Sequence, residues 1–126
     1  MNLAERQKKY EQSYDFKIID NIPVILRING KNFSKLSKDL NKPFSNDLFK
    51  IMANATMYSI TEIQGVIFGY LHHDEVTFVI RNDQTHETQS WLNNRIQKIN
   101  SIAVSTFTMA FYKFLLASDL ELPGDP

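Results

Sequence analysis

The chain has 126 residues, of which 43% are hydrophobic, so we expect a single domain with one core over residues 1–126. Its 14 basic and 14 acidic residues give a formal net charge of zero, which excludes a strongly basic nucleic-acid arm. The absence of cysteine excludes disulfides, thiolate zinc sites and cysteine nucleophiles. No signal-like segment opens the chain and no run approaches the roughly 18 apolar residues of a membrane span, which predicts a cytoplasmic protein with no membrane partner.

The first half of the chain alternates helix-like and strand-like segments. Residues 3–13 contain helix formers and few breakers, which predicts a short polar helix. Residues 22–28, IPVILRI, form a continuous β-branched run and predict a strand buried on both faces. Asn29-Gly30 ends that strand, and apolar residues at helical spacing predict a helix over residues 31–40.

The second half begins with another helical pattern, over residues 47–63. The apolar runs 66–71 and 76–80 then flank the segment HHDE at the spacing of a β-hairpin. From residue 88 to residue 117, apolar residues recur every three or four positions, which predicts one long helix with a buried stripe.

The order of these elements predicts an α+β fold. A β-α-β-β-α sequence matches the ferredoxin-type antiparallel sheet with helices on one face, without the last strand. In that topology the first and third strands are antiparallel neighbours, so the end of one lies beside the start of the other. Asn29-Gly30 should therefore lie next to Asp74-Glu75, with the N-terminus of the following helix available to phosphate oxygens.

Each of these features also has a purely structural explanation. Asn-Gly is a common turn signal, and the HHDE segment fits a solvated hairpin turn. Arg95 and Lys98 fit a solvated helix face. His72, His73 and His86 make no convincing zinc site, because no thiolate or HExxH spacing accompanies them. Only the joint arrangement indicates a metal–triphosphate site.

Four segments in order carry a resemblance to a known family. They are RINGKNF (27–33), KPF (42–44), EIQGVIFGYLHHDEVTF (62–78) and RIQKINSIAVSTFTMAF (95–111). Together they resemble the N-terminal catalytic domain of the tRNA-His guanylyltransferase family. The resemblance implies a palm-like fold and a nucleotidyltransferase that adds a GTP-derived nucleotide to the 5′ end of tRNA, in the 3′-5′ direction. It also implies GTP and ATP as substrates, tRNA as a partner, and a homo-oligomer, which is a tetramer in the family.

The resemblance implies a role for individual residues. Asp74 would be shared by two Mg²⁺ ions, with the Gly30 carbonyl as a further ligand and Asn29 at the remaining metal position, while Asp74 and Glu75 would be the catalytic carboxylates. Two such ions stabilise the attacking and leaving oxygens of a phosphoryl displacement. The positions that match nucleotide-contacting residues are Lys31, Asn32, Phe33, Lys42, His73, Arg95 and Lys98.

The chain departs from the family pattern in three places. Asn29 stands where the family has a metal-binding Asp, so the site loses a negative charge and weaker Mg²⁺ binding is expected. His73 replaces a Ser and Lys31 an Arg, and the sequence stops at LPGDP, before the family's further strand and C-terminal region. Two hypotheses follow: a Mg²⁺-dependent nucleotidyltransferase, or a non-catalytic palm-like module that binds a nucleotide or a protein.

Overall fold

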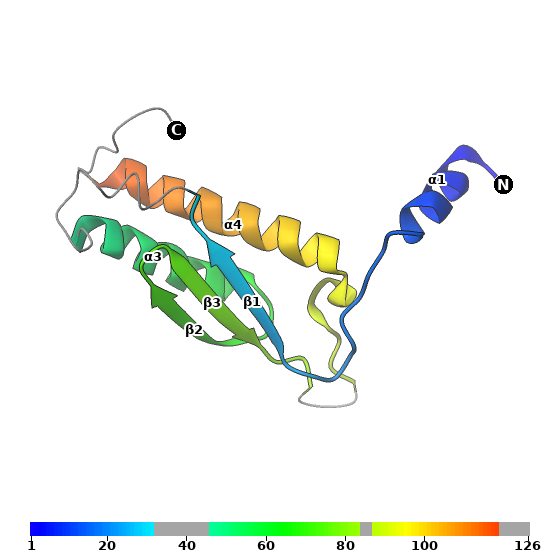
Figure 1. The fold of residues 1–126 in the computed structure, drawn as a ribbon, viewed down its shortest axis with the longest axis horizontal. Helices are drawn as coiled ribbons and strands as arrows, with labels where there is room; N and C mark the ends of the chain where they lie inside the picture. The colour runs from blue at the N-terminus through cyan, green and yellow to red at the C-terminus, as the bar shows by residue number, and fades with distance from the viewer. Residues whose placement is uncertain (32–45, 84–86, 119–126) are drawn as a thin grey trace.

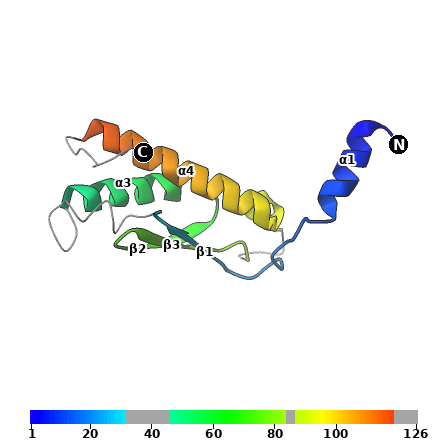
Figure 2. The same ribbon diagram turned by 45° about the horizontal axis from the view of Figure 1, so that its top comes forward.

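The computed structural model describes residues 1–31, 46–83 and 87–118. Within these ranges three strands form an antiparallel sheet in the order β1-β3-β2, and helices α3 and α4 lie over one face of it (Figure 1, Figure 2). The elements are α1 (Leu3–Gln12), β1 (Val24–Asn29), α3 (Asn46–Glu62), β2 (Val66–His72), β3 (Glu75–Ile80), the 3-10 turn Trp91–Asn94 and α4 (Ile96–Ala117). The predicted α+β fold is confirmed. The helix predicted over residues 31–40 lies outside the described residues after Lys31.

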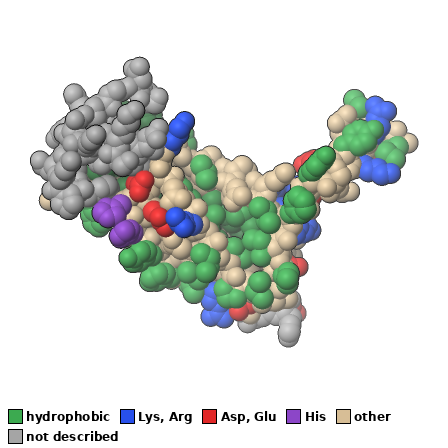
Figure 3. All heavy atoms as spheres, viewed as in Figure 1, with side chains coloured by type: hydrophobic (Ala, Val, Ile, Leu, Met, Phe, Trp, Pro, Cys, Tyr) green, Lys and Arg blue, Asp and Glu red, His purple; other side chains and the backbone are tan. Residues whose placement is uncertain are grey.

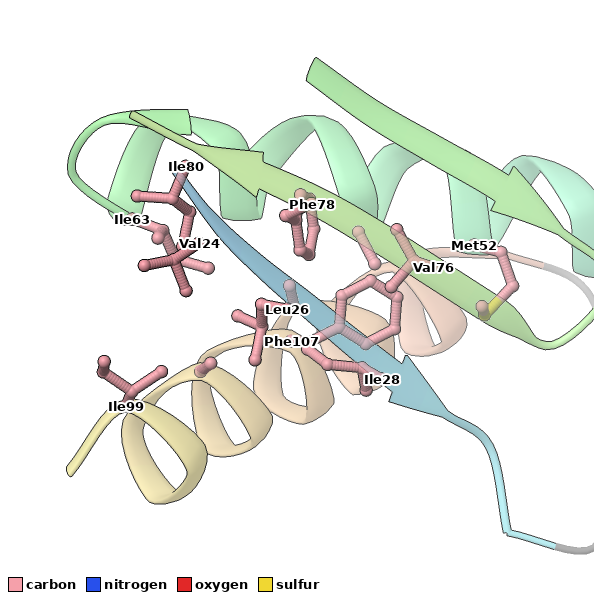
Figure 4. Close-up of a cluster of buried hydrophobic side chains, with 13 residues drawn as sticks. Val24, Leu26, Ile28, Met52, Ile63, Val76, Phe78, Ile80, Ile99 and Phe107 are labelled. Carbon is pink, nitrogen blue, oxygen red and sulfur yellow. The ribbon is translucent and has the colours of Figure 1, made fainter. Parts of the chain in front are cut away.

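The core lies between the sheet and the two helices. Along β1 and β3, alternate side chains turn inward, and the buried set is Val24, Leu26, Ile28, Val76, Phe78 and Ile80. They pack against buried residues of α3 and α4, which include Met52, Ala55, Ile99, Ala103 and Phe107 (Figure 4). The prediction that the first strand is buried on both faces is wrong, because the helices cover only one face and Ile25, Arg27 and Asn29 are exposed.

Gly65, which links α3 to β2, occupies a position that other residues fit poorly. Its φ is +86°, and a Cβ added there would lie 2.9 Å from the carbonyl oxygen of Arg81. The Arg81 N–H in turn donates to the Gly65 carbonyl, at 2.9 Å. The two backbone segments therefore cannot separate to make room for a Cβ without stretching this hydrogen bond. This contact fixes the connection from helix to sheet.

Replacing Gly65 with alanine should lower the free energy of unfolding by about 1–3 kcal/mol, because the left-handed conformation and the Cβ contact are both unfavourable. Urea unfolding followed by circular dichroism measures the change. Asn21→Gly is the control, since Asn21 also has a positive φ, of 65°, where glycine is at ease. A Gly65→Ala protein as stable as the Asn21→Gly protein would contradict the prediction.

The last helix begins later than its apolar pattern predicts. Leu92, Asn93 and Asn94 all have positive φ, between 51° and 55°, so the chain makes a left-handed turn here and α4 starts only at Ile96. The backbone here pairs with the segment before β1: the Ile18 N–H donates to the Asn94 carbonyl and the Ile96 N–H to the Phe16 carbonyl. The prediction of helix from residue 88 is therefore wrong, because these long-range bonds take the place of a helical turn.

Helix α1 matches the predicted polar helix. Its N-terminus has a capping box, in which the Glu5 N–H donates to Asn2 Oδ1 at 2.8 Å and the Asn2 N–H donates to Glu5 Oε2 at 3.1 Å. None of its residues is buried, and the helix stands away from the sheet (Figure 1). The helix is therefore held by its local hydrogen bonds and by one long-range ion pair, between Glu11 and Arg95 at 3.4 Å, while none of its residues is buried in the core.

Helix α4 is long and apolar enough to cross a membrane when judged by length and composition alone. The prediction that no apolar run approaches the length of a membrane span did not identify this helix, because polar residues interrupt every continuous apolar run of α4. The helix also serves the fold: Ile99, Ala103, Phe107 and Ala110 are buried in the core. Core helices meet the same composition test, so the finding by itself is weak evidence for a membrane.

Candidate functional site

The end of β1 and the start of β3 lie side by side at one end of the sheet, which is called the Asp74 edge below. The register pairs Asn29 with Glu75, and the Gly30 N–H donates to the carbonyl oxygen of Asp74 at 2.8 Å. Two polar segments that lie far apart in the sequence are thus held together by backbone hydrogen bonds. The predicted convergence of Asn29-Gly30 and Asp74-Glu75 is confirmed.

The carboxylate of Glu75 has a basic partner that the sequence reasoning missed. Arg27 Nε lies 2.6 Å from Glu75 Oε1, and the side chains are 60% and 31% exposed, respectively. Arg27 lies two residues before Asn29 on the same face of β1, so it is diagonal to Glu75 across the strand pair. The register of β1 against β3 places Arg27 beside Glu75, so working out this register from the predicted topology could have revealed the pair. An ion pair this exposed adds little stability, but it orients the carboxylate.

The turn between β2 and β3 has only two residues, His73 and Asp74. His73 has a φ of 55°, a left-handed conformation that histidine adopts more readily than most residues. Its ring meets that of His72 edge to face, with centroids 4.3 Å apart. His73 therefore shapes the hairpin turn, whatever else it contacts.

Side-chain and main-chain oxygen atoms at this edge are ligands of the kind that Mg²⁺ prefers. They are the carboxylates of Asp74 and Glu75, the Asn29 amide and the Gly30 carbonyl. Among the residues that the structure describes, no group of three or more His, Cys, Asp or Glu side chains gathers to hold a metal. The donor set fits Mg²⁺ in the manner of sites where one or two carboxylates bind the ion and substrate phosphates supply further oxygens.

The other predicted nucleotide contacts fall into three groups. Lys31 follows Gly30 directly and is exposed, so it lies at the same edge. Asn32, Phe33 and Lys42 lie outside the described residues, and their roles stay predictions.

Arg95 and Lys98 lie at the opposite end of the core. Arg95 Nε lies 2.9 Å from Asp15 Oδ1, and Arg95 is a bridge partner of Lys17, in the segment that leads into β1. The hydrogen bond that Arg95 donates to the Asp15 carboxylate raises the pKa of the Arg95 guanidinium. Ile99, one residue after Lys98, lies toward the Val24 end of β1 (Figure 4). The strand is about 16 Å long at roughly 3.3 Å per residue, so the structure does not bring Arg95 and Lys98 to the Asp74 edge. Their contact with a nucleotide stays a prediction.

Comparison with known proteins assigns the chain to a family. A family model described as tRNAHis guanylyltransferase matches residues 4–121. The chain belongs to the tRNAHis guanylyltransferase family. An uncharacterized protein of Acanthamoeba polyphaga mimivirus is 30% identical over 115 residues, and a probable tRNA(His) guanylyltransferase of Drosophila melanogaster is 28% identical over 113 residues. These matches cover 86% and 88% of this chain but only 39% and 38% of the relatives.

Solved structures of the family share the fold. A bacterial tRNA(His) guanylyltransferase (Thg1)-like protein in complex with GTP is 34% identical, with a TM-score of 0.85, over 90% of this chain and 52% of the other. The corresponding ATP complex gives a TM-score of 0.86, at 34% identity, over 91% of this chain and 50% of the other. The palm-like fold is thereby confirmed, and the chain spans about half the length of these proteins.

Proposed function

We propose that this chain is the catalytic part of a nucleotidyltransferase that adds a GTP-derived nucleotide to the 5′ end of tRNA, in the 3′-5′ direction. The observation that carries the proposal is the pairing of Asn29-Gly30 with Asp74-Glu75 at one sheet edge. Family membership and the likeness to a protein in complex with GTP support GTP, and by the ATP complex also ATP, as substrates.

In this proposal Asp74, the Gly30 carbonyl and the Asn29 amide hold two Mg²⁺ ions. Bound there, Mg²⁺ supplies charge stabilisation to the attacking and leaving oxygens of an in-line phosphoryl displacement. Glu75 is the second carboxylate, beside Asp74, with its charge partly balanced by Arg27, and exposed Lys31 offers an ammonium group to the triphosphate. The strand pairing fixes the positions from which these side chains act, which lowers the cost of orienting the substrate.

Three further expectations belong to the same proposal. The protein would act on tRNA in the cytoplasm without a membrane partner, as a single catalytic domain, and the homo-oligomer expected from the resemblance stays a prediction.

The competing hypothesis, a non-catalytic nucleotide-binding or scaffold module, differs in one measurable property. Such a module has no need for Mg²⁺ at the Asp74 edge.

The test is calorimetric titration of GTP into the chain with and without Mg²⁺. Binding that requires Mg²⁺ is expected, since substrate phosphates and ions complete each other's coordination at such sites. GTP affinity that is the same in Mg²⁺ and in excess chelator, or no GTP binding at all, would favour the non-catalytic module.

Replacing Asn29 with aspartate should strengthen Mg²⁺-dependent GTP binding by about tenfold, because a carboxylate attracts the ion more strongly than an amide does. The same titration measures the gain. Asn100→Asp is the matched control: it adds the same charge at an exposed position on α4 and should leave affinity unchanged. Equal affinities for the Asn29→Asp and wild-type proteins would mean that no metal binds at this position.

A further inference from the structure

The face of the sheet opposite the helices carries a row of exposed rings. Phe68, Tyr70 and His72 alternate along β2 with Gly69 and Leu71, which point toward the helices. Phe68 and Tyr70 are each 56% exposed. Figure 3 shows this face, with hydrophobic side chains extending over the sheet from a group of histidine, acidic and basic side chains. Three rings thus line one edge strand, on the open side.

Two of the rings lie nearly parallel, and the row leads to the candidate site. The rings of Tyr70 and His72 are nearly parallel, with an interplanar angle of 9° and centroids 6.3 Å apart. His72 pairs in register with Glu75, so the row ends at the edge that holds Asp74. A strand places alternate side chains on one face, which spaces the rings regularly along β2.

A basic group beside the row favours a nucleobase as the occupant, while Ile25, 72% exposed, adds apolar surface on the same face. The Arg27 side chain, 60% exposed and paired through Nε with Glu75, lies on the same open face, and planar guanidinium groups stack on bases and bind phosphates. Proteins bind unpaired nucleic acid through aromatic rings on an open sheet beside basic groups. The candidate phosphoryl-transfer edge would hold one RNA end beside His72, so the neighbouring nucleotides of that end would pass over β2.

We infer that Phe68, Tyr70 and His72 form a stacking surface for unpaired bases next to the RNA end at the Asp74 edge. The identity of the RNA rests on the proposed function; the stacking surface itself rests on the exposed rings. The rings would guide the RNA end toward the edge, with Tyr70 as the central contact.

The test compares two RNA hairpins of the same sequence, one blunt-ended and one with a four-nucleotide single-stranded extension, in binding to the full chain. Tyr70→Leu and Phe68→Leu remove a ring but keep an apolar side chain, and each should weaken binding of the extended hairpin by about tenfold. Tyr70→Phe keeps the ring and should bind within about twofold of the wild type. Tyr112→Leu, an exposed ring on α4, is the matched control and should have no effect.

Four outcomes would overturn the inference: no preference of the wild type for the extended hairpin, unchanged binding after Tyr70→Leu, an equal loss in Tyr112→Leu, or a dimer that dissociates on Phe68→Leu. The last would mean that a second copy of the chain covers this face. Mg²⁺-dependent GTP binding, measured on the same variants, separates the two proposals. Ring-dependent RNA binding without GTP binding would support the stacking surface while refuting the proposed function.

Discussion

Replacing Asp74 with alanine is expected to abolish Mg²⁺-dependent GTP binding, with a loss of at least about 100-fold in affinity. Asp74 is the carboxylate that the proposed function assigns to both ions, and the neighbouring carboxylate of Glu75 is engaged by Arg27 at 2.6 Å. Removing a ligand costs more than removing a supporting group, which typically costs 10–100-fold in metal affinity. The substitution removes only the side chain, so the Asp74 carbonyl still accepts from the Gly30 N–H.

Calorimetry with saturating Mg²⁺ measures this loss, and circular dichroism verifies the fold. Asp83→Ala is the matched control, because Asp83 follows the other end of β3 and pairs with Arg81, 3.0 Å away. That variant should bind GTP as the wild type does. If Asp74→Ala retained wild-type affinity in Mg²⁺, the metal site would have to lie elsewhere, and if both variants lost binding equally, the effect would not be local.

Replacing Phe78 with alanine should lower the free energy of unfolding by about 3–5 kcal/mol, a large share of the roughly 5–15 kcal/mol typical of a domain. Phe78 is completely buried at the centre of β3, opposite Leu26 of β1 and Gly69 of β2. A Cβ added to Gly69 would lie 3.5 Å from Cδ1 of the Phe78 ring, so the ring packs closely against β2. Residues of α3 and α4 pack over the ring from the helix side, so its removal leaves a cavity between the sheet and the helices.

Urea unfolding measures the loss, and Phe68→Ala provides the comparison. Phe68 lies on the neighbouring strand but is 56% exposed on the open face, so its removal should cost less than about 1 kcal/mol. Similar losses for the two variants would show that the open face is buried in solution, and would contradict the arrangement of the sheet described above.

Much of the fold and the location of the site followed from local patterns. The apolar runs 66–71 and 76–80 around HHDE predicted a hairpin, and the match of the element order to a ferredoxin-type sheet then brought Asn29 beside Glu75. These features depend on neighbouring residues and on the few ways in which a β-α-β-β-α chain closes.

The remaining features depend on contacts between distant segments. Whether the first strand is covered on one face or two is decided by where the helices pack, which the apolar run does not record. The left-handed turn before α4 follows from backbone bonds with residues 16–18, and the position of Arg95 from its contact with Asp15. Sequence periodicity carries no information on contacts between distant segments. The predicted start of the last helix was therefore wrong, and the distance of Arg95 from the Asp74 edge was not foreseen.

The hydrogen bond between Gly30 and Asp74 joins main-chain atoms only. This hydrogen bond therefore does not depend on the side chain of Asp74 or on that of the neighbouring Asn29, and either can change while the bond is kept. That separation explains how an asparagine can stand at position 29 in an otherwise intact fold. Single substitutions of these side chains can therefore change the ligands that the edge offers to a metal ion while the main-chain pairing stays the same.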